Sequence, residues 1–84
     1  MPGEHLVGKV THYYDKLGVA ILDLFDSLSV GQTVRFKGAH DDFSQTVNGM
    51  QFDHAEISEA HSGEEVGIKV EQKVHENDEV FVVE

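Results

Sequence analysis

The stretch Ser62-Gly63-Glu64-Glu65-Val66-Gly67-Ile68 has the pattern of a tight turn that feeds a half-buried β-strand. Its order of Gly or Asn, a polar residue, any residue, Val, any residue and an apolar residue recurs within Ser29–Phe36 and within Glu76–Val82. Glycine and asparagine adopt positive φ angles at low cost, which such turns require. The sequence therefore predicts three strands that begin with the same turn chemistry.

Period-two alternation of side-chain character runs through most of the remaining chain. It is clear at 6–11, 20–24 and 34–37, and it returns at 66–71 and 79–83. Such alternation is typical of half-buried strands. We expect an all-β fold, a small closed or nearly closed antiparallel β-barrel of about six strands, because closure hides the edges of a small sheet. No linker interrupts the chain, so residues 1–84 are expected to form one domain.

Two segments depart from this alternation. In Phe43–Phe52 the apolar residues change from odd to even positions around Asn48-Gly49, which predicts a bulge or bend. In Asp53–Ser62 the apolar residues fit neither the strand nor the helix period. We expect this second segment to be a loop or a single helical turn pinned by Ile57.

Composition narrows the class of protein. The 84 residues include no cysteine, and no stretch approaches the ~20 consecutive apolar residues that a membrane span needs. The start, Met1–His5, has neither a basic nor an apolar region of the kind found in export signals. A small domain without disulfides fits a reducing compartment. These features predict a soluble cytoplasmic protein that does not bind membranes.

Charge bears on possible partners. The chain has 16 acidic residues against six Lys and Arg, which gives a formal net charge of −10. Affinity for phosphates is built mainly from Lys and Arg, so DNA is not an expected partner. A local basic patch can still bind RNA, because screening confines the mean field to ~8–10 Å. The surplus of acid also favours a soluble monomer.

Several runs resemble a known family. They are Val7–Val10, Val19–Leu22, Leu28–Val34, Met50–Phe52 and Ala60–Ile68. Together they resemble the second, β-barrel domain of translational GTPases such as elongation factor Tu. The chain is also similar to short translation elongation factor-like proteins and to the barrel appended to collagenase-like peptidases. Gln32 stands where that family usually has Asp, and Asn77 where it usually has Gly.

The resemblance implies a fold and a binding role. Nucleotide binding in translational GTPases belongs to a separate domain with a P-loop, Gly-x-x-x-x-Gly-Lys-Ser/Thr, and this chain contains no such run. No cofactor is therefore expected. The second domain of those factors contacts tRNA and the ribosome, which makes RNA a possible partner beside a protein.

Candidate catalytic and metal-binding groups find little support. The six histidines lack a convergent spacing: His5 and His12 are an odd number of residues apart, and no His-Glu-x-x-His run occurs. The pairs Asp41-Asp42 and Glu64-Glu65 are predicted to lie solvated in turns. No nucleophile-elbow run Gly-x-Ser-x-Gly is present. We expect no metal site and no catalytic residue, so the chain is not expected to be an enzyme.

The best candidate for a binding site is a set of cations with one aromatic residue. Lys9 and Tyr13 are predicted on one face of the first strand, and Arg35 and Lys37 on one face of another. If these strands are neighbours, the four side chains form a patch suited to RNA ends, since tyrosine stacks on bases and cations bind phosphates. The alternative is that Tyr13 or Tyr14 covers the mouth of the barrel and the cations pair with carboxylates.

Two functions follow. The first is a translation-factor-like binding module that docks as an adaptor on a protein or on an RNA-containing partner, tRNA or the ribosome. The second is an accessory domain that acts in trans with an enzyme of the collagenase-like peptidase type.

Overall fold

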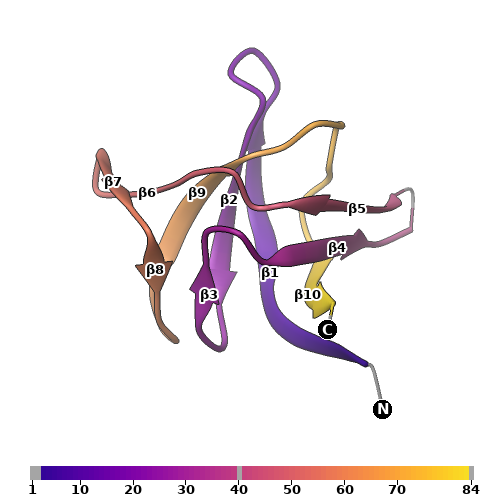
Figure 1. Ribbon diagram of the computed structural model, residues 1–84. Coiled ribbons are helices and arrows are strands. Elements are labelled where there is room, and N and C mark those ends of the chain that lie inside the picture. The colour runs from indigo at the N-terminus through magenta and orange to yellow at the C-terminus, as the bar shows by residue number, and fades with distance from the viewer. Residues whose placement is uncertain (1–2, 40, 84) are drawn as a thin grey trace.

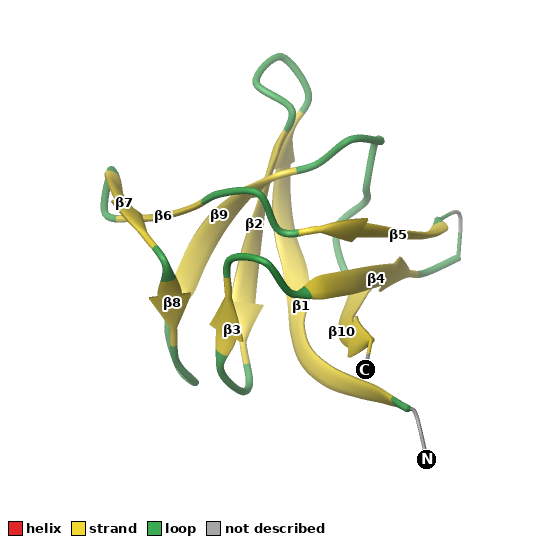
Figure 2. Cartoon of the chain, viewed as in Figure 1, coloured by secondary structure: helices red, strands yellow, loops and turns green. Residues whose placement is uncertain are grey.

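The computed structural model describes residues 3–39 and 41–83, in which the chain forms ten strands. These are β1 (Glu4–Tyr14), β2 (Val19–Leu24), β3 (Leu28–Ser29), β4 (Thr33–Lys37), β5 (Asp42–Thr46), β6 (Met50–Phe52), β7 (Ala55–Ile57), β8 (Glu59–Ala60), β9 (Glu65–Lys69) and β10 (Glu79–Val83) (Figure 1). Loops and turns connect the strands (Figure 2). No helix that is long and apolar enough to cross a membrane is found in this part of the chain.

Eight strands form one antiparallel sheet in the order β5-β4-β10-β1-β2-β9-β6-β7, and β3 pairs with β8 in a second sheet. The predicted all-β antiparallel class is confirmed. The expectation of a closed or nearly closed barrel of about six strands is wrong, because β5 and β7 remain edges of an open sheet. The sheet curls, so that β4 and β5 lie on one side of the molecule and β6 and β7 on the other (Figure 1).

One buried side chain connects edge strand β5 to the chain that follows β9. The Nε2 group of Gln45, in edge strand β5, donates to the backbone oxygen of Lys69 at 2.9 Å. Its Oε1 atom accepts from the backbone N–H of Glu71 at 2.8 Å. Beyond β9 the chain bends to the β1–β2 turn, where the N–H of Val70 donates to the oxygen of Gly18. A side-chain amide therefore replaces the ladder between β5 and the end of β9.

The three predicted turns are confirmed. Gly31, Gly63 and Asn77 have φ angles of 98°, 87° and 75°. Each lies two residues before a strand, respectively β4, β9 and β10. The shared pattern in the sequence thus marks a shared backbone conformation.

Of the two irregular segments, residues 53–62 differ from the predicted structure. Residues 53–62 are not a loop or a helical turn, since they contain β7 and β8. The β6–β7 turn uses Asp53 and His54, both at positive φ, where glycine or asparagine is the usual signal. Ile57 packs against the core as predicted. Around Asn48-Gly49 the chain leaves β5 and begins β6, which explains the change in parity.

A single cluster of buried apolar side chains fills the curl of the sheet. Phe36 is the largest of them, and its ring stacks on Phe43 with the ring centroids 5.2 Å apart. Close packing also requires Gly8 in β1, because a Cβ there would lie 2.8 Å from the backbone oxygen of Asp23. The core thus packs against one face of the main sheet, and the opposite face of the strands is turned outward.

The turn before β9 gives a direct test of the fold. Replacing Gly63 with valine places a β-branched residue at φ 87°, so we expect a loss of roughly 1–3 kcal/mol in the free energy of unfolding. Urea denaturation followed by circular dichroism measures it. Gly49→Val is the control, because Gly49 has no positive φ and a Cβ there meets no atom within 4 Å. Equal stability of the two variants would contradict the turn assignment.

Candidate functional site

The predicted cationic patch is divided by β10. β1 and β4 are not neighbours, because β10 pairs with both. In the resulting row Lys9 lies opposite Glu79, and Glu79 lies opposite Lys37. A carboxylate therefore separates the two lysines, and a phosphate group approaching one of them also approaches that negative charge.

A bulge removes the aromatic member of the patch. The register between β1 and β2 shifts between Val10 and His12, so Thr11 is an extra residue in the strand. Beyond it the inward and outward positions exchange, and Tyr13 packs against the core. Tyr13 and Lys9 consequently do not share a face. Among the four predicted residues, the structure brings Lys9 and Lys37 into one row and leaves Tyr13 elsewhere.

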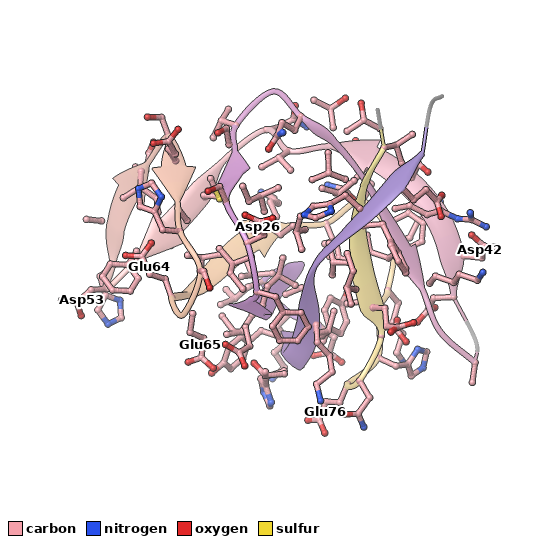
Figure 3. All side chains as sticks on the ribbon, turned by 90° about the horizontal axis from the view of Figure 1, so that it is seen from below. Asp26, Asp42, Asp53, Glu64, Glu65 and Glu76 are labelled. Carbon is pink, nitrogen blue, oxygen red and sulfur yellow. The ribbon has the colours of Figure 1, made fainter. Side chains whose placement is uncertain are left out.

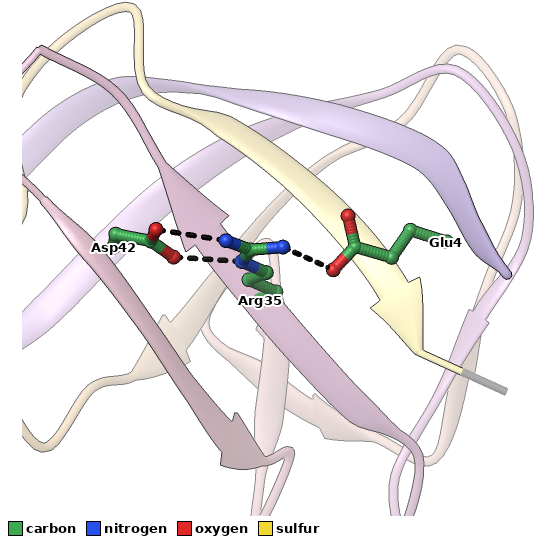
Figure 4. Close-up of polar contacts among 3 residues, drawn as sticks. All are labelled: Glu4, Arg35 and Asp42. Carbon is green, nitrogen blue, oxygen red and sulfur yellow. Dashed lines mark hydrogen bonds and ion pairs between the residues drawn. The ribbon is translucent and has the colours of Figure 1, made fainter.

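Arg35 is engaged by two carboxylates (Figure 4). Its Nε and Nη2 atoms donate to the two oxygens of Asp42 at 2.7 and 2.8 Å, and its Nη1 atom donates to Glu4 at 2.7 Å. These bonds hold the pKa of Asp42 below its usual value and raise the pKa of Arg35. The guanidinium ties the start of β1 to β4 and β5, and it is not presented to a ligand.

A second polar cluster joins the β4–β5 turn to the segment before β10. The Nδ1 atom of His75 lies 2.7 Å from a carboxylate oxygen of Asp41, and the backbone N–H of His75 donates to Asp78 at 3.0 Å. Asp78 is 3% exposed, and a Cβ at Gly38 would overlap its carboxylate. The Asp41 side chain is 10% exposed. The prediction that Asp41 is solvated is therefore wrong, whereas Asp42 is exposed as expected.

Burial, together with the neighbouring carboxyl of Asp41, raises the pKa of Asp78 to about 6. Because this value exceeds that of an unfolded aspartate, protonated Asp78 favours the folded state. The stabilisation is complete below about pH 4 and is lost as the pH rises through about 6. At neutral pH the ionised carboxylate of Asp78 therefore destabilises the folded state.

Donor atoms of Asp41, His75 and Asp78 lie within 4.8 Å of one another, and sequence spacing gave no sign of this group. His75 and Asp41 bond to each other, and the absence of a metal site stays a prediction. Three other histidines each meet one carboxylate, in the pairs His5–Asp26, His12–Glu76 and His61–Glu59. The hydrogen bond from His5 lowers the pKa of Asp26. His40 lies outside the described residues.

A hollow on the outer face of β2, β9 and β6 was not foreseen from the sequence. It consists of two adjoining parts of about 500 and 400 Å³ that share Leu17, Val19, Gln51 and Gly67. Leu17 is 65% exposed and Tyr14, at the second part, is 46% exposed. Asp53 and Glu65 are among the acidic side chains that line it. In Figure 3 these two lie towards one side of the molecule, and Asp42, which belongs to the ion pair with Arg35, lies towards the other.

Comparison with known proteins relates this structure to proteases. No protein-family model matches the chain. An uncharacterized protease of Methanocaldococcus jannaschii is 32% identical over 78 residues, which are 92% of this chain and 19% of that protein. The chain is homologous to part of a protease. It spans about a fifth of the length of this curated relative.

Two crystal structures identify the fold. Both contain the C-terminal domain of a Geobacillus thermoleovorans protein described as a U32 peptidase. One has a TM-score of 0.87 at 21% identity, covering 93% of this chain and 91% of that chain. The other, a selenomethionine variant, has a TM-score of 0.86 at 22% identity, covering 90% and 96%. The chain thus has the fold of a U32 peptidase C-terminal domain.

These findings confirm one side of the resemblance predicted from the sequence. The similarity to the barrel of collagenase-like peptidases is confirmed at the level of a homologous C-terminal domain. The similarity to the second domain of elongation factor Tu stays a prediction.

The protonation of Asp78 can be tested by Asp78→Asn, since asparagine resembles the protonated acid. As the pH rises from 4 to 7, we expect the stability of the variant relative to the wild type to increase by about 1–2 kcal/mol of unfolding free energy. Urea denaturation at each pH measures the difference, in which the contributions of other carboxylates cancel. Asp15→Asn, at an exposed turn position, is the control for removing one charge. A difference that does not change with pH would refute the assignment.

Proposed function

We propose that this chain is a non-catalytic accessory domain that works with a U32-type peptidase catalytic domain. The observation that carries the proposal is the homology of 92% of the chain to a segment of a protease that makes up only 19% of the whole protein. A segment of that size corresponds to one domain beside a much larger remainder. The fold, which is that of a C-terminal domain of a U32 peptidase, supports the same assignment.

The residue content supports a role without catalysis. The chain has no cysteine and no nucleophile-elbow run. The Asp41–His75 pair has the bond of a base and its orienting carboxylate, but His75 also anchors the turn before β10 through its backbone. A histidine that holds two segments together serves the fold in this arrangement. We therefore assign peptide-bond cleavage to the partner domain.

The competing function, a translation-factor-like adaptor on RNA, has less support. It depends on Lys9, Arg35, Lys37 and Tyr13 acting together. Glu79 lies between the lysines, Arg35 is bonded to two carboxylates and Tyr13 packs against the core. With a net charge of −10, binding of phosphates needs such a gathered patch.

The accessory role predicts a complex. We expect the purified chain to bind a U32-type catalytic domain from the same organism with a dissociation constant of about 10 μM or below, measured by isothermal titration calorimetry. Neither the chain alone nor its Asp41→Asn variant should hydrolyse fluorescent casein. Absence of a complex, or casein hydrolysis by the wild-type chain that Asp41→Asn abolishes, would contradict the proposal.

The RNA function predicts a different result. If the patch binds RNA, replacing Lys9, Arg35 and Lys37 with alanine abolishes co-sedimentation with ribosomes and binding of tRNA. We expect instead that the wild-type chain is not retained by either at physiological salt, because its cations are separated and paired. Retention of the wild type, with loss in the triple variant, would restore the adaptor function.

A further inference from the structure

We propose that the hollow lined by Leu17, Val19, Gln51 and Gly67 is a docking groove for an extended polypeptide segment of a partner protein. The segment carries apolar side chains flanked by lysine or arginine. This inference rests on the proposed function, since it names the surface and the chemistry by which the accessory domain binds its partner.

The floor of the groove is a gap in a row of side chains. Gly67 in β9 lies opposite Ile21 of β2 and opposite Gln51 of β6, so a glycine separates two full side chains on the outer face. A Cβ at position 67 would lie 3.3 Å from methyl groups of Ile21 and Val19. Its φ is not positive, so the turn chemistry that requires Gly63 does not apply here. With no side chain at position 67, the surface of β9 lies low here, and the methyl groups of Ile21 and Val19 lie against the glycine.

The walls are apolar and open to solvent. Leu17 belongs to the β1–β2 turn and stands 65% exposed, and Tyr14 at the end of β1 is 46% exposed. Val19 and Ile21 add half-buried methyl groups beside them. Apolar side chains gathered around one concave surface are typical of a site for a partner, whereas single exposed apolar residues are ordinary.

Carboxylates outnumber lysines on the rim that the structure describes. Asp53, Glu56 and Glu65 line the two parts of the groove, and none forms an ion pair with another described residue. Asp23 lies directly opposite Glu65 in the β2–β9 ladder, a like-charge arrangement, and Lys9 lies opposite Asp23 on its other side. Lys69 is the one Lys or Arg among the described lining residues. Lysine or arginine on the occupant complements the surplus of carboxylates that Asp53, Glu56 and Glu65 give the rim.

The shape of the groove favours an extended occupant. Its two parts adjoin through shared residues, so they suit successive same-side residues of a strand, about 7 Å apart. Beside it β7, which contributes Glu56, pairs with β6 alone and forms an edge of the main sheet. An edge strand offers backbone hydrogen bonds to an added strand. A second copy of this chain is disfavoured, because two acidic rims repel each other.

The test is a titration of the ¹⁵N-labelled chain with the peptide Lys-Leu-Lys-Leu-Lys, followed by amide chemical shifts. We expect the largest shift changes at Leu17, Val19, Gln51 and Gly67. The acidic counterpart Glu-Leu-Glu-Leu-Glu should cause none. Shift changes centred elsewhere, or no binding of the basic peptide, would overturn the proposal.

Variants separate the groove from exposed apolar surface in general. Leu17→Ser should weaken binding of the basic peptide about tenfold, which corresponds to a loss of ~1.4 kcal/mol. Phe25→Ser is the matched control, because Phe25 is 48% exposed and does not line the groove. Glu65→Gln should also weaken binding, and Glu79→Gln, on β10, should not. Equal effects of the groove and control variants would contradict the proposed site.

Failure of the groove proposal can be distinguished from failure of the proposed accessory function. If Leu17→Ser leaves the complex with the U32-type catalytic domain unchanged, the accessory role stands and the groove is not its docking surface. Sedimentation velocity without peptide tests whether a second copy of the chain occupies the groove. Self-association of the wild type that Leu17→Ser abolishes would assign the groove to a second copy of the chain and overturn the proposal.

Discussion

The constraint on which this fold depends is the closing of an open sheet around one small core. Strands β5 and β7 end the sheet, and a ladder between them is missing. The buried amide of Gln45 crosses from β5 to the chain beyond β9 and satisfies one carbonyl and one N–H there. A buried amide is favourable only when its donors and acceptors are paired, and here they replace two ladder bonds. Together with the β3–β8 pair, this amide links segments that the main sheet leaves unpaired.

The few cations of the chain also have structural roles. Arg35 bonds to Glu4 and Asp42, so it fastens the first strand to the edge of the sheet near β5. Because the one arginine is engaged in these ion pairs, five lysines remain against a large surplus of acidic residues. The acid that remains near Gly67 has no such partner among the described residues. This charge distribution is the basis on which we propose a basic protein surface, and not a nucleic acid, as the partner.

Features set by local conformation could be predicted from the sequence, and features set by strand order could not. The positive φ angles of Gly31, Gly63 and Asn77 follow from residue type within a short pattern. The extra residue at Thr11 has no such signal, yet it reverses the facing of Tyr13. The insertion of β10 between β1 and β4, the Asp41–His75–Asp78 cluster and the groove all join segments far apart in sequence. A strict alternation therefore gave the fold class and misplaced the candidate site.

The run that most specifically carries the predicted family resemblance, Ala60 to Ile68, contains glycines with two different physical roles. Gly63 has a φ of 87° and open space where a Cβ would stand, so its role is conformational. Gly67 has no positive φ and lies against methyl groups of Val19 and Ile21, so its role is steric. The first glycine is needed to turn the chain into β9. The second shapes the outer face of that strand, and a surface role explains it without any demand from the backbone.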